Sequence, residues 1–180
     1  MRRRARKGQS LIEFTFVGIP IIFVLISIFE ISRGMWIYHT LAYSVKVGVR
    51  SAVVHGINCV PAATNNQDNC QVTMGQITQT IRNAAVGLDP AQTELTFIPG
   101  AGGAASTGPC QLDGTSAACT GNWPFYDSTG GTNQDAIGQP LTIQIRTPFH
   151  SAIAMFWPGA KTTQFGSFTL GATSTDYIQF

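Results

Sequence analysis

The chain has 180 residues, of which 44% are hydrophobic, and a formal net charge of +2; this composition is sufficient for one domain with an apolar core. Five of its eleven Lys and Arg residues precede position 8, and from position 9 onward six basic residues stand against nine acidic ones. The chain beyond its basic start therefore lacks the positive surface that a nucleic-acid partner requires.

The first predicted element is an apolar helix that follows the basic cluster of residues 2–7. The uncharged run from residue 14 to 29, extended back to Ser10, spans about 30 Å as a helix, which is the thickness of a hydrocarbon core. The excess of positive charge before it predicts a cytoplasmic N-terminus and export of everything after about residue 30. The run continues into "EISRGMWIY" without a small-x-small site, and the first cysteine is Cys59, which argues against a secretory signal peptide and a lipoprotein.

Apolar residues at steps of three and four predict that this helix continues to about residue 54, where "HGINCVP" ends it. We interpret the stripe as the face that packs against the exported domain, with a coiled-coil seam as the alternative. Pro20 is expected to kink the helix, and Trp36 lies where an interfacial aromatic is expected. The stripe consists of Ile31, Met35, Tyr38, Ala42, Val45, Val49 and Ala52.

The exported region is predicted to be α+β, with a small antiparallel sheet. A second helix is expected over 72–88, ended by Asp89 and Pro90. Alternating apolar and polar residues predict three strands, over 93–99, 140–147 and 167–175. The Gly-rich connection 99–139 is interpreted as loop, and it lacks the context of a phosphate-binding loop.

Four cysteines, an even set, lie in the part predicted to be exported, where disulfides persist. Three pairings are possible, and we favour Cys59 with Cys70 and Cys110 with Cys119 because short loops close most easily. Each bridge is worth about 2 to 3 kcal/mol. A zinc site is disfavoured because the spacings are far wider than those of paired metal ligands.

No catalytic, metal or cofactor site is predicted. His39, His55 and His150 share no motif, and the Asp residues are isolated in polar segments typical of turns. The segment "AIAMFWPG", residues 152–159, is interpreted as core packing, with an exposed contact surface as the alternative.

Two motifs carry a family resemblance. "KGQSLIEF" resembles the processing site of type IV pilin-like precursors, in which a basic leader ends in Gly8, cleavage exposes Gln9, and Glu13 is the fifth mature residue. Residues 8–56 are similar to the TadE-like proteins, which are minor pilins or pseudopilins of the tight-adherence (Flp) pilus system. The matching positions are Glu30, Arg33, Gly48, Arg50 and Ala52.

The resemblance implies a pilin-like fold, with a cleaved leader (1–8), a transmembrane helix (9–30), its exported continuation (31–56) and a periplasmic α+β head (57–180). The disulfide-closed loops of this head are predicted from the cysteines and not from the resemblance. It implies a structural role at the bacterial inner membrane, with the N-terminus cytoplasmic. The implied partners are a prepilin peptidase, other pilins and assembly proteins, and inner-membrane lipid. The alternative is an uncleaved single-pass envelope protein whose head binds a ligand or a surface component.

Glu13 has a defined role in this scheme. A carboxylate at membrane depth costs about 2.5 to 3.5 kcal/mol, so it requires a partner or a place near the interface. Pilin-like assembly implies that Glu13 neutralises the new α-amino group of Gln9 on a neighbouring subunit; the alternative is that Glu13 simply lies at the headgroup boundary. Glu30 and Arg33 are expected to form a one-turn ion pair at the membrane exit.

Overall fold

The computed structural model describes residues 7–55, 72–100, 108–119, 121–123, 137–151 and 167–179, with backbone only for residues 7–10, 118, 122 and 167. Leader residues 1–6, Cys59, Cys70 and the segment 152–159 lie outside the described residues. The chain divides into two compact units. One combines residues 1–36 with 150–167, and the other combines 37–149 with 168–180 and is called the head below.

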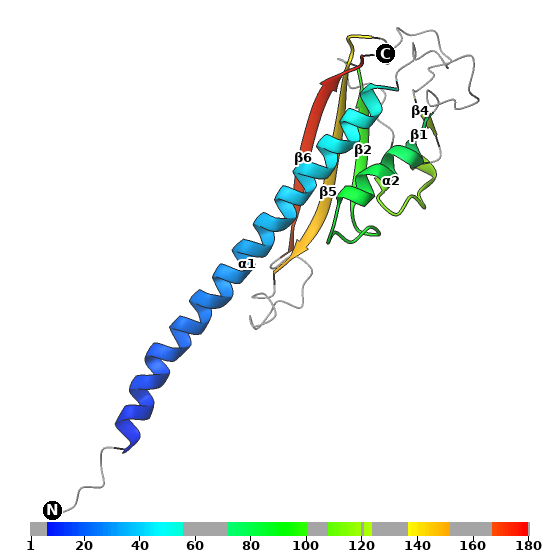
Figure 1. Ribbon diagram of the computed structural model, residues 1–180. Coiled ribbons are helices and arrows are strands. Elements are labelled where there is room, and N and C mark those ends of the chain that lie inside the picture. Colours follow the sequence, from blue (N-terminus) through cyan, green and yellow to red (C-terminus); the bar gives the residue numbers. More distant parts are fainter. Residues whose placement is uncertain are drawn as a thin grey trace, which may run out of the picture. The chain divides into compact units, whose positions relative to one another are not determined.

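Helix α1 covers Lys7–Val53 and is coloured from blue to cyan in Figure 1. It begins before the apolar run and ends one residue before the predicted end. The helix continues through Pro20, where the sequence predicts a kink. Proline has no N–H, so only the bond that the carbonyl of Phe16 would receive from residue 20 is lost from the helical ladder.

The predicted stripe on α1 is buried only in the head. Val45, Val49 and Ala52 are in the core, whereas Ile31 is 64% exposed and Met35 and Tyr38 are also exposed. The core face of α1 instead begins at half-buried Ile37 and continues through buried residues at helical spacing. These buried residues are Leu41, Ser44, Val45, Gly48, Val49, Ala52 and Val53.

The main sheet has four strands in the order β3-β2-β5-β6, formed by Cys110–Gln111, Glu94–Pro99, Pro140–His150 and Ser167–Tyr177. Strand β2 pairs antiparallel with β3 and β5, and the arrows of β5 and β6 point in opposite directions in Figure 1. Strands β1 (Val72–Thr73) and β4 (Asn122–Trp123) form a separate antiparallel pair. The predicted α+β class with a small antiparallel sheet is confirmed.

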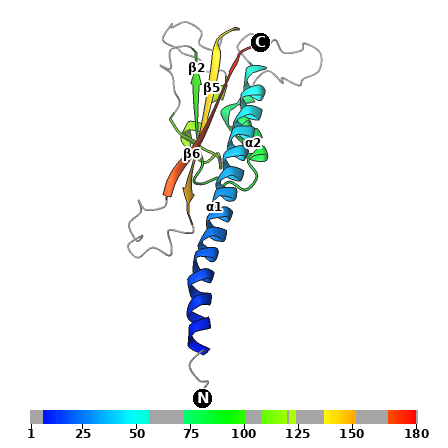
Figure 2. The same cartoon turned by 90° about the vertical axis from the view of Figure 1, so that its left-hand side faces the viewer.

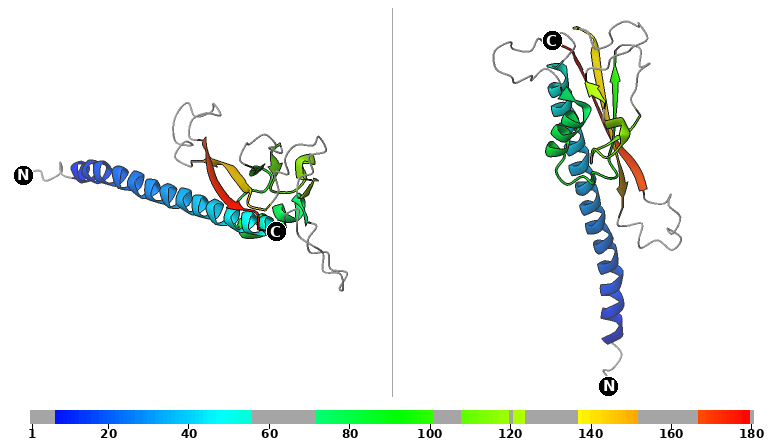
Figure 3. Two further views of the ribbon diagram at one scale, coloured as in Figure 1. Left: turned by 90° about the horizontal axis from the view of Figure 1, so that it is seen from above. Right: turned by 90° about the vertical axis from the view of Figure 1, so that its right-hand side faces the viewer.

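The head has two layers, with helices on one face of the sheet. Helix α2, Met74–Ala84, lies beside the second half of α1 on the same side of the sheet in Figures 1, 2 and 3. The strands alternate as predicted, and the register brings Leu95 opposite Ile145 and Phe97 opposite Ile143. All four of these side chains are fully buried, so this face of the sheet forms the core with the helices.

Helix α2 is shorter than predicted at both ends. Val72 and Thr73 pair with β4, and Thr73 caps the helix: its hydroxyl accepts from the Gln76 N–H while the Gln76 side chain accepts from the Thr73 N–H. The helix ends at Ala84, because Ala85 is no longer helical and Gly87 takes a positive φ of 86°.

The connection 99–139, which the sequence predicts to be loop, contributes short elements to the head. It contains β3, the 3₁₀ turn Ala117–Cys119 and β4. A disulfide joins Cys110 to Cys119, as predicted, and both cysteines are buried. Within the loop that it closes, the N–H and hydroxyl of Thr115 donate to Asp113 and hold the pKa of this carboxyl below its usual value.

Candidate functional site

The residues that the sequence singles out lie along α1, and the apolar first part of this helix is its most unusual surface. Its most apolar 18-residue window has no buried residue, and α1 is long and apolar enough to cross a membrane. Apolar exposure of this extent far exceeds the patches found on soluble monomers. The exposed large residues before Ile31 are Leu11, Ile12, Phe14, Phe16, Val17, Ile19, Ile21, Ile22, Phe23, Val24, Leu25, Ile28 and Phe29.

The hydroxyl groups in this apolar stretch bond within the helix. Thr15, Ser27 and Ser32 each donate to the carbonyl oxygen four residues earlier, at 2.8 Å. A hydroxyl satisfied in this way needs no water or side-chain partner. These three residues are therefore compatible with hydrocarbon surroundings.

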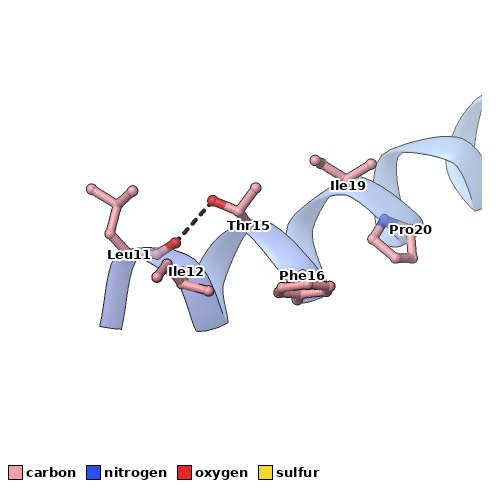
Figure 4. Close-up of a pocket in the computed structure, with 6 residues that line it drawn as sticks. All are labelled: Leu11, Ile12, Thr15, Phe16, Ile19 and Pro20. Carbon is pink, nitrogen blue, oxygen red and sulfur yellow. Dashed lines mark hydrogen bonds between the residues drawn. The ribbon is translucent and has the colours of Figure 1, made fainter. Parts of the chain in front are cut away.

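A shallow apolar hollow lies at the start of the helix, around Phe16 and Pro20 (Figure 4). All its lining residues come from α1, and its one visible polar contact is the bond from Thr15 to the Leu11 carbonyl. A hollow with walls from a single helix is open on one side, so it is a surface that a lipid chain or another helix can fill. The lining residues are Leu11, Ile12, Thr15, Phe16, Ile19 and Pro20.

The predicted cleavage site and docking carboxylate lie within the first two turns of α1. Gly8 and Gln9 are already helical, and Glu13 lies four residues after Gln9, which is one turn along the helix. The side chain of Glu13 is exposed. The structure thus places Glu13 on the surface of the apolar section, next to the hollow-lining Ile12 in sequence.

Glu30 and Arg33 form the predicted ion pair across one helical turn, with Arg33 Nη1 3.8 Å from Glu30 Oε1. The Arg33 side chain is 51% exposed but that of Glu30 only 13%. A pair of this spacing contributes a few tenths of a kcal/mol at most. Its main effect is therefore to place a positive charge beside the Glu30 carboxylate at the end of the apolar section.

Gly48 has a clear structural role in the head. A Cβ built on this residue would lie 2.5 Å from Cδ1 of Ile81 and closer still to its Cγ1, well inside van der Waals contact. Ile81 is fully buried in α2. Gly48 is therefore the position at which α1 lets α2 approach.

The C-terminal end of α1 is stabilised by the charge of Arg50 and by hydrogen bonds to its last carbonyl groups. Arg50 is exposed in the last turn, where a positive charge complements the helix dipole. The Ala52 carbonyl accepts from Trp123 Nε1–H at 3.0 Å, and the Val53 carbonyl accepts from the N–H of Gln179, also at 3.0 Å. The end of the helix is thus satisfied by two segments far away in sequence.

Sequence reasoning missed Trp123. Its side chain is 1% exposed and it belongs to β4, but it lies in the connection predicted to be loop. A lone tryptophan among Gly and Asn residues was the available signal, since tryptophan rarely lacks a packing role.

The predicted site residues do not converge on one point. Glu13, Glu30, Gly48 and Arg50 are spread along α1, and the Cys110–Cys119 bridge belongs to the sheet side of the head. Among the described residues, no group of three or more His, Cys, Asp or Glu side chains is placed to hold a metal ion. Glu13 and Arg50 are exposed whereas Gly48 is buried, so these residues do not form one site.

The class defined by these features is an α+β head carried by an apolar helix that can span a membrane. The family model described as TadE-like protein matches residues 8–50. This match confirms the predicted resemblance and supports a role in the tight-adherence pilus system. Comparison with curated proteins gave no match, and comparison with solved structures gave none either.

Proposed function

We propose that this protein is a structural, membrane-anchored minor pilin or pseudopilin of a tight-adherence pilus. The observation that carries the proposal is the coincidence of the TadE-like match, residues 8–50, with a helix whose first part is exposed and apolar. An apolar helical section with no buried residue needs lipid or other helices around it. A subunit that moves from a bilayer into a helical bundle meets both needs.

The organisation that we propose follows the charge distribution. Residues 1–8 are a cytoplasmic leader removed by a prepilin peptidase, 9–30 span the inner membrane, 31–56 include the exported end of α1, and 57–180 are periplasmic. The basic residues before position 8 hold the leader on the cytoplasmic side. The partners are the peptidase, inner-membrane lipid, and the other pilins and assembly proteins of the system.

Glu13 is the docking charge in this proposal. The Glu13 side chain is exposed on α1, and a charged carboxylate is expensive in hydrocarbon, at about 2.5 to 3.5 kcal/mol. Cleavage after Gly8 creates an α-amino group on Gln9 that can neutralise it in trans. The apolar hollow that begins at Leu11 and Ile12 then receives side chains of the adjoining helix.

Processing is tested by the intact mass of the protein purified from cells that contain the peptidase. The expected first residue is Gln9, and a peptidase-deficient strain supplies the uncleaved control. A chain that keeps its leader in the competent strain contradicts the proposal.

Docking is tested by Glu13→Gln, with Glu94→Gln as the matched control because Glu94 is an exposed glutamate of the head. Glu13→Gln is expected to leave membrane insertion intact while lowering recovery in the sheared pilus fraction about tenfold, which corresponds to 1.4 kcal/mol. Glu94→Gln is expected to change neither quantity. Equal recovery of the Glu13→Gln variant and the unmodified chain contradicts the docking role.

A further inference from the structure

We propose that α2 is a lid over the Cys110–Cys119 disulfide, and that this bridge exchanges with thiols only when α2 lifts from the loop 110–119 while the sheet stays formed. The two cysteines are 0% and 2% exposed, although Gly114 and Thr115 in the loop between them are exposed. A thiol has to reach a sulfur atom to exchange with it, so the closed head withholds the bridge from reductants. The proposal concerns the head alone and does not depend on the proposed pilus role.

One face of α2 lies against both cysteines. The Thr78 hydroxyl is 3.4 Å from Cys110 Sγ, and it is the donor because a disulfide sulfur carries no proton. Three residues earlier, a Cβ built on Gly75 would lie 3.4 Å from the carbonyl oxygen of Cys119. Residues three apart in a helix are on the same face. The cover over the bridge is therefore made by described residues of α2.

The same face of α2 also acts on the loop through charge. The pKa of Asp113 is held below its usual value mainly by the two bonds from Thr115, and the positive charge of Arg82 lowers it further. Arg82 follows Thr78 by four residues, so it belongs to the face that covers the sulfur atoms. A charge pair near solvent contributes little, so the lid is held closed mainly by apolar packing of α2.

This apolar packing is made by Ile77 and Ile81, which are both buried. All three atoms that a Cβ on Gly48 would meet within 4 Å belong to Ile81. A methyl group at residue 48 therefore presses on α2 and not on the bridge. Gly48→Ala consequently weakens the docking of the lid without changing any residue of the loop 110–119.

The bridge belongs to the core side of the sheet. Cys110 is in β3 and stands directly opposite Leu95 of β2, which is fully buried. Opposite residues of an antiparallel pair have their side chains on one face, so the Cys110 side chain is on the face that the helices cover. A reagent can thus reach the sulfur atoms by two routes, which are the lifting of α2 and the unfolding of the whole head.

A lid at this place determines when the bridge can form. In oxidation, the thiolate of one cysteine attacks the disulfide of an oxidant, and the second cysteine then displaces the oxidant from the mixed disulfide. Two electrons and two protons pass from the cysteines to the oxidant, which leaves as two thiols. The bridge therefore has to form before α2 docks or while it is lifted, and once the lid is closed the bridge persists in a reducing medium.

The test measures the rate at which dithiothreitol reduces the bridge in the full chain in detergent, with the released thiols of Cys110 and Cys119 alkylated and counted by peptide mass. We expect the native rate to be about 100-fold below the rate in unfolding urea. Gly48→Ala should raise the native rate about tenfold, because it weakens the docking of α2. Ile178→Val is the matched control. It removes a buried methyl group directly after β6, where the backbone bonds go to the residues before β5, so it should lower the stability of the head but change the rate less than about twofold.

The urea dependence of the native rate gives a second readout that needs no variant. Lifting α2 exposes less surface than unfolding the head, so the logarithm of the reduction rate should rise with urea less steeply than the logarithm of the unfolding equilibrium constant. A native rate equal to the unfolded rate overturns the proposal, and so does a native rate that Gly48→Ala leaves unchanged. Equal acceleration by Gly48→Ala and Ile178→Val, or a urea slope equal to that of global unfolding, also overturns it, because the route would then be unfolding of the whole head.

Discussion

Gly48→Ala tests whether the close approach of α1 and α2 holds the head together. In an unconstrained helix this substitution would stabilise by about 0.5 to 1 kcal/mol, because glycine loses more backbone entropy than alanine. Here the new methyl group overlaps Cγ1 and Cδ1 of Ile81, a fully buried β-branched residue with little rotamer freedom. Overpacking of this kind costs about 1 to 3 kcal/mol. We therefore expect a net destabilisation of about 1 to 2 kcal/mol.

In the Ile81→Ala background, Gly48→Ala is expected to stabilise the head instead of destabilising it. The substitution alone should cost about 2 to 5 kcal/mol, because it leaves a cavity between the helices. The Cβ of residue 81 lies 3.8 Å from the Cβ that alanine would add at residue 48, which is ordinary contact. Gly48→Ala in the Ile81→Ala background should therefore stabilise by about 1 kcal/mol, from helix propensity and partial filling of the cavity.

The measurement is urea unfolding of the full chain in detergent, followed by near-ultraviolet circular dichroism for all four members of the double-mutant cycle. Gly18→Ala is the matched control, since it is a glycine of the same helix whose new Cβ would meet only Phe14, at 3.9 Å, and it lies outside the head. It should not change the unfolding midpoint of the head. A destabilisation by Gly48→Ala that persists unchanged in the Ile81→Ala background would refute the reasoning.

Two further predictions concern the head. Trp123→Phe keeps an aromatic ring but removes the donor to the Ala52 carbonyl, so it should lower the free energy of unfolding by about 1 to 3 kcal/mol in urea titrations, and an unchanged midpoint contradicts this role. Cys110→Ser with Cys119→Ser removes the bridge across a nine-residue separation and should cost about 2 to 3 kcal/mol, and reducing agent should lower the stability of the double variant less than that of the unmodified chain. A double variant as stable as the unmodified chain would show that the bridge adds nothing to the fold.

The fold was predictable where a periodic pattern was strong. The alternation of Leu141, Ile143 and Ile145 identified a central strand, and the apolar run identified the first part of α1, because both patterns repeat the geometry of the element itself. The continuation of α1 beyond residue 36 was also predictable, but its exact core face was not. Apolar residues at a helical spacing show that a stripe exists, and only the position of the sheet determines that Leu41 is buried and Tyr38 exposed.

The short elements were not predictable. Strands β1, β3 and β4 have two residues each, too few to show any period. They form by pairing with other strands, and β3 is also held by the Cys110–Cys119 disulfide. The end of α2 at Ala84 was missed for a related reason, since Leu88 continues the helical spacing of Ile81 and Ala84 although the backbone leaves the helix at Ala85.

The same difference between local and long-range contacts applies to the candidate site residues. The motif residues from Gly8 to Arg50 could be named from the sequence, and the ion pair of Glu30 and Arg33 was predictable because it is local. The tertiary role of Gly48 was not, because the residue that needs its missing side chain, Ile81, is more than thirty positions away.

The bond from the Gln179 N–H to the Val53 carbonyl, with Ile178 buried beside it, has a consequence for biosynthesis. Strand β6 and Gln179 are translated long after α1. The helix is therefore synthesised well before its partners, and the head cannot complete its sheet until residues 167–179 have left the ribosome. A nascent chain interrupted before that point would carry its anchor together with an open, aggregation-prone layer of strands.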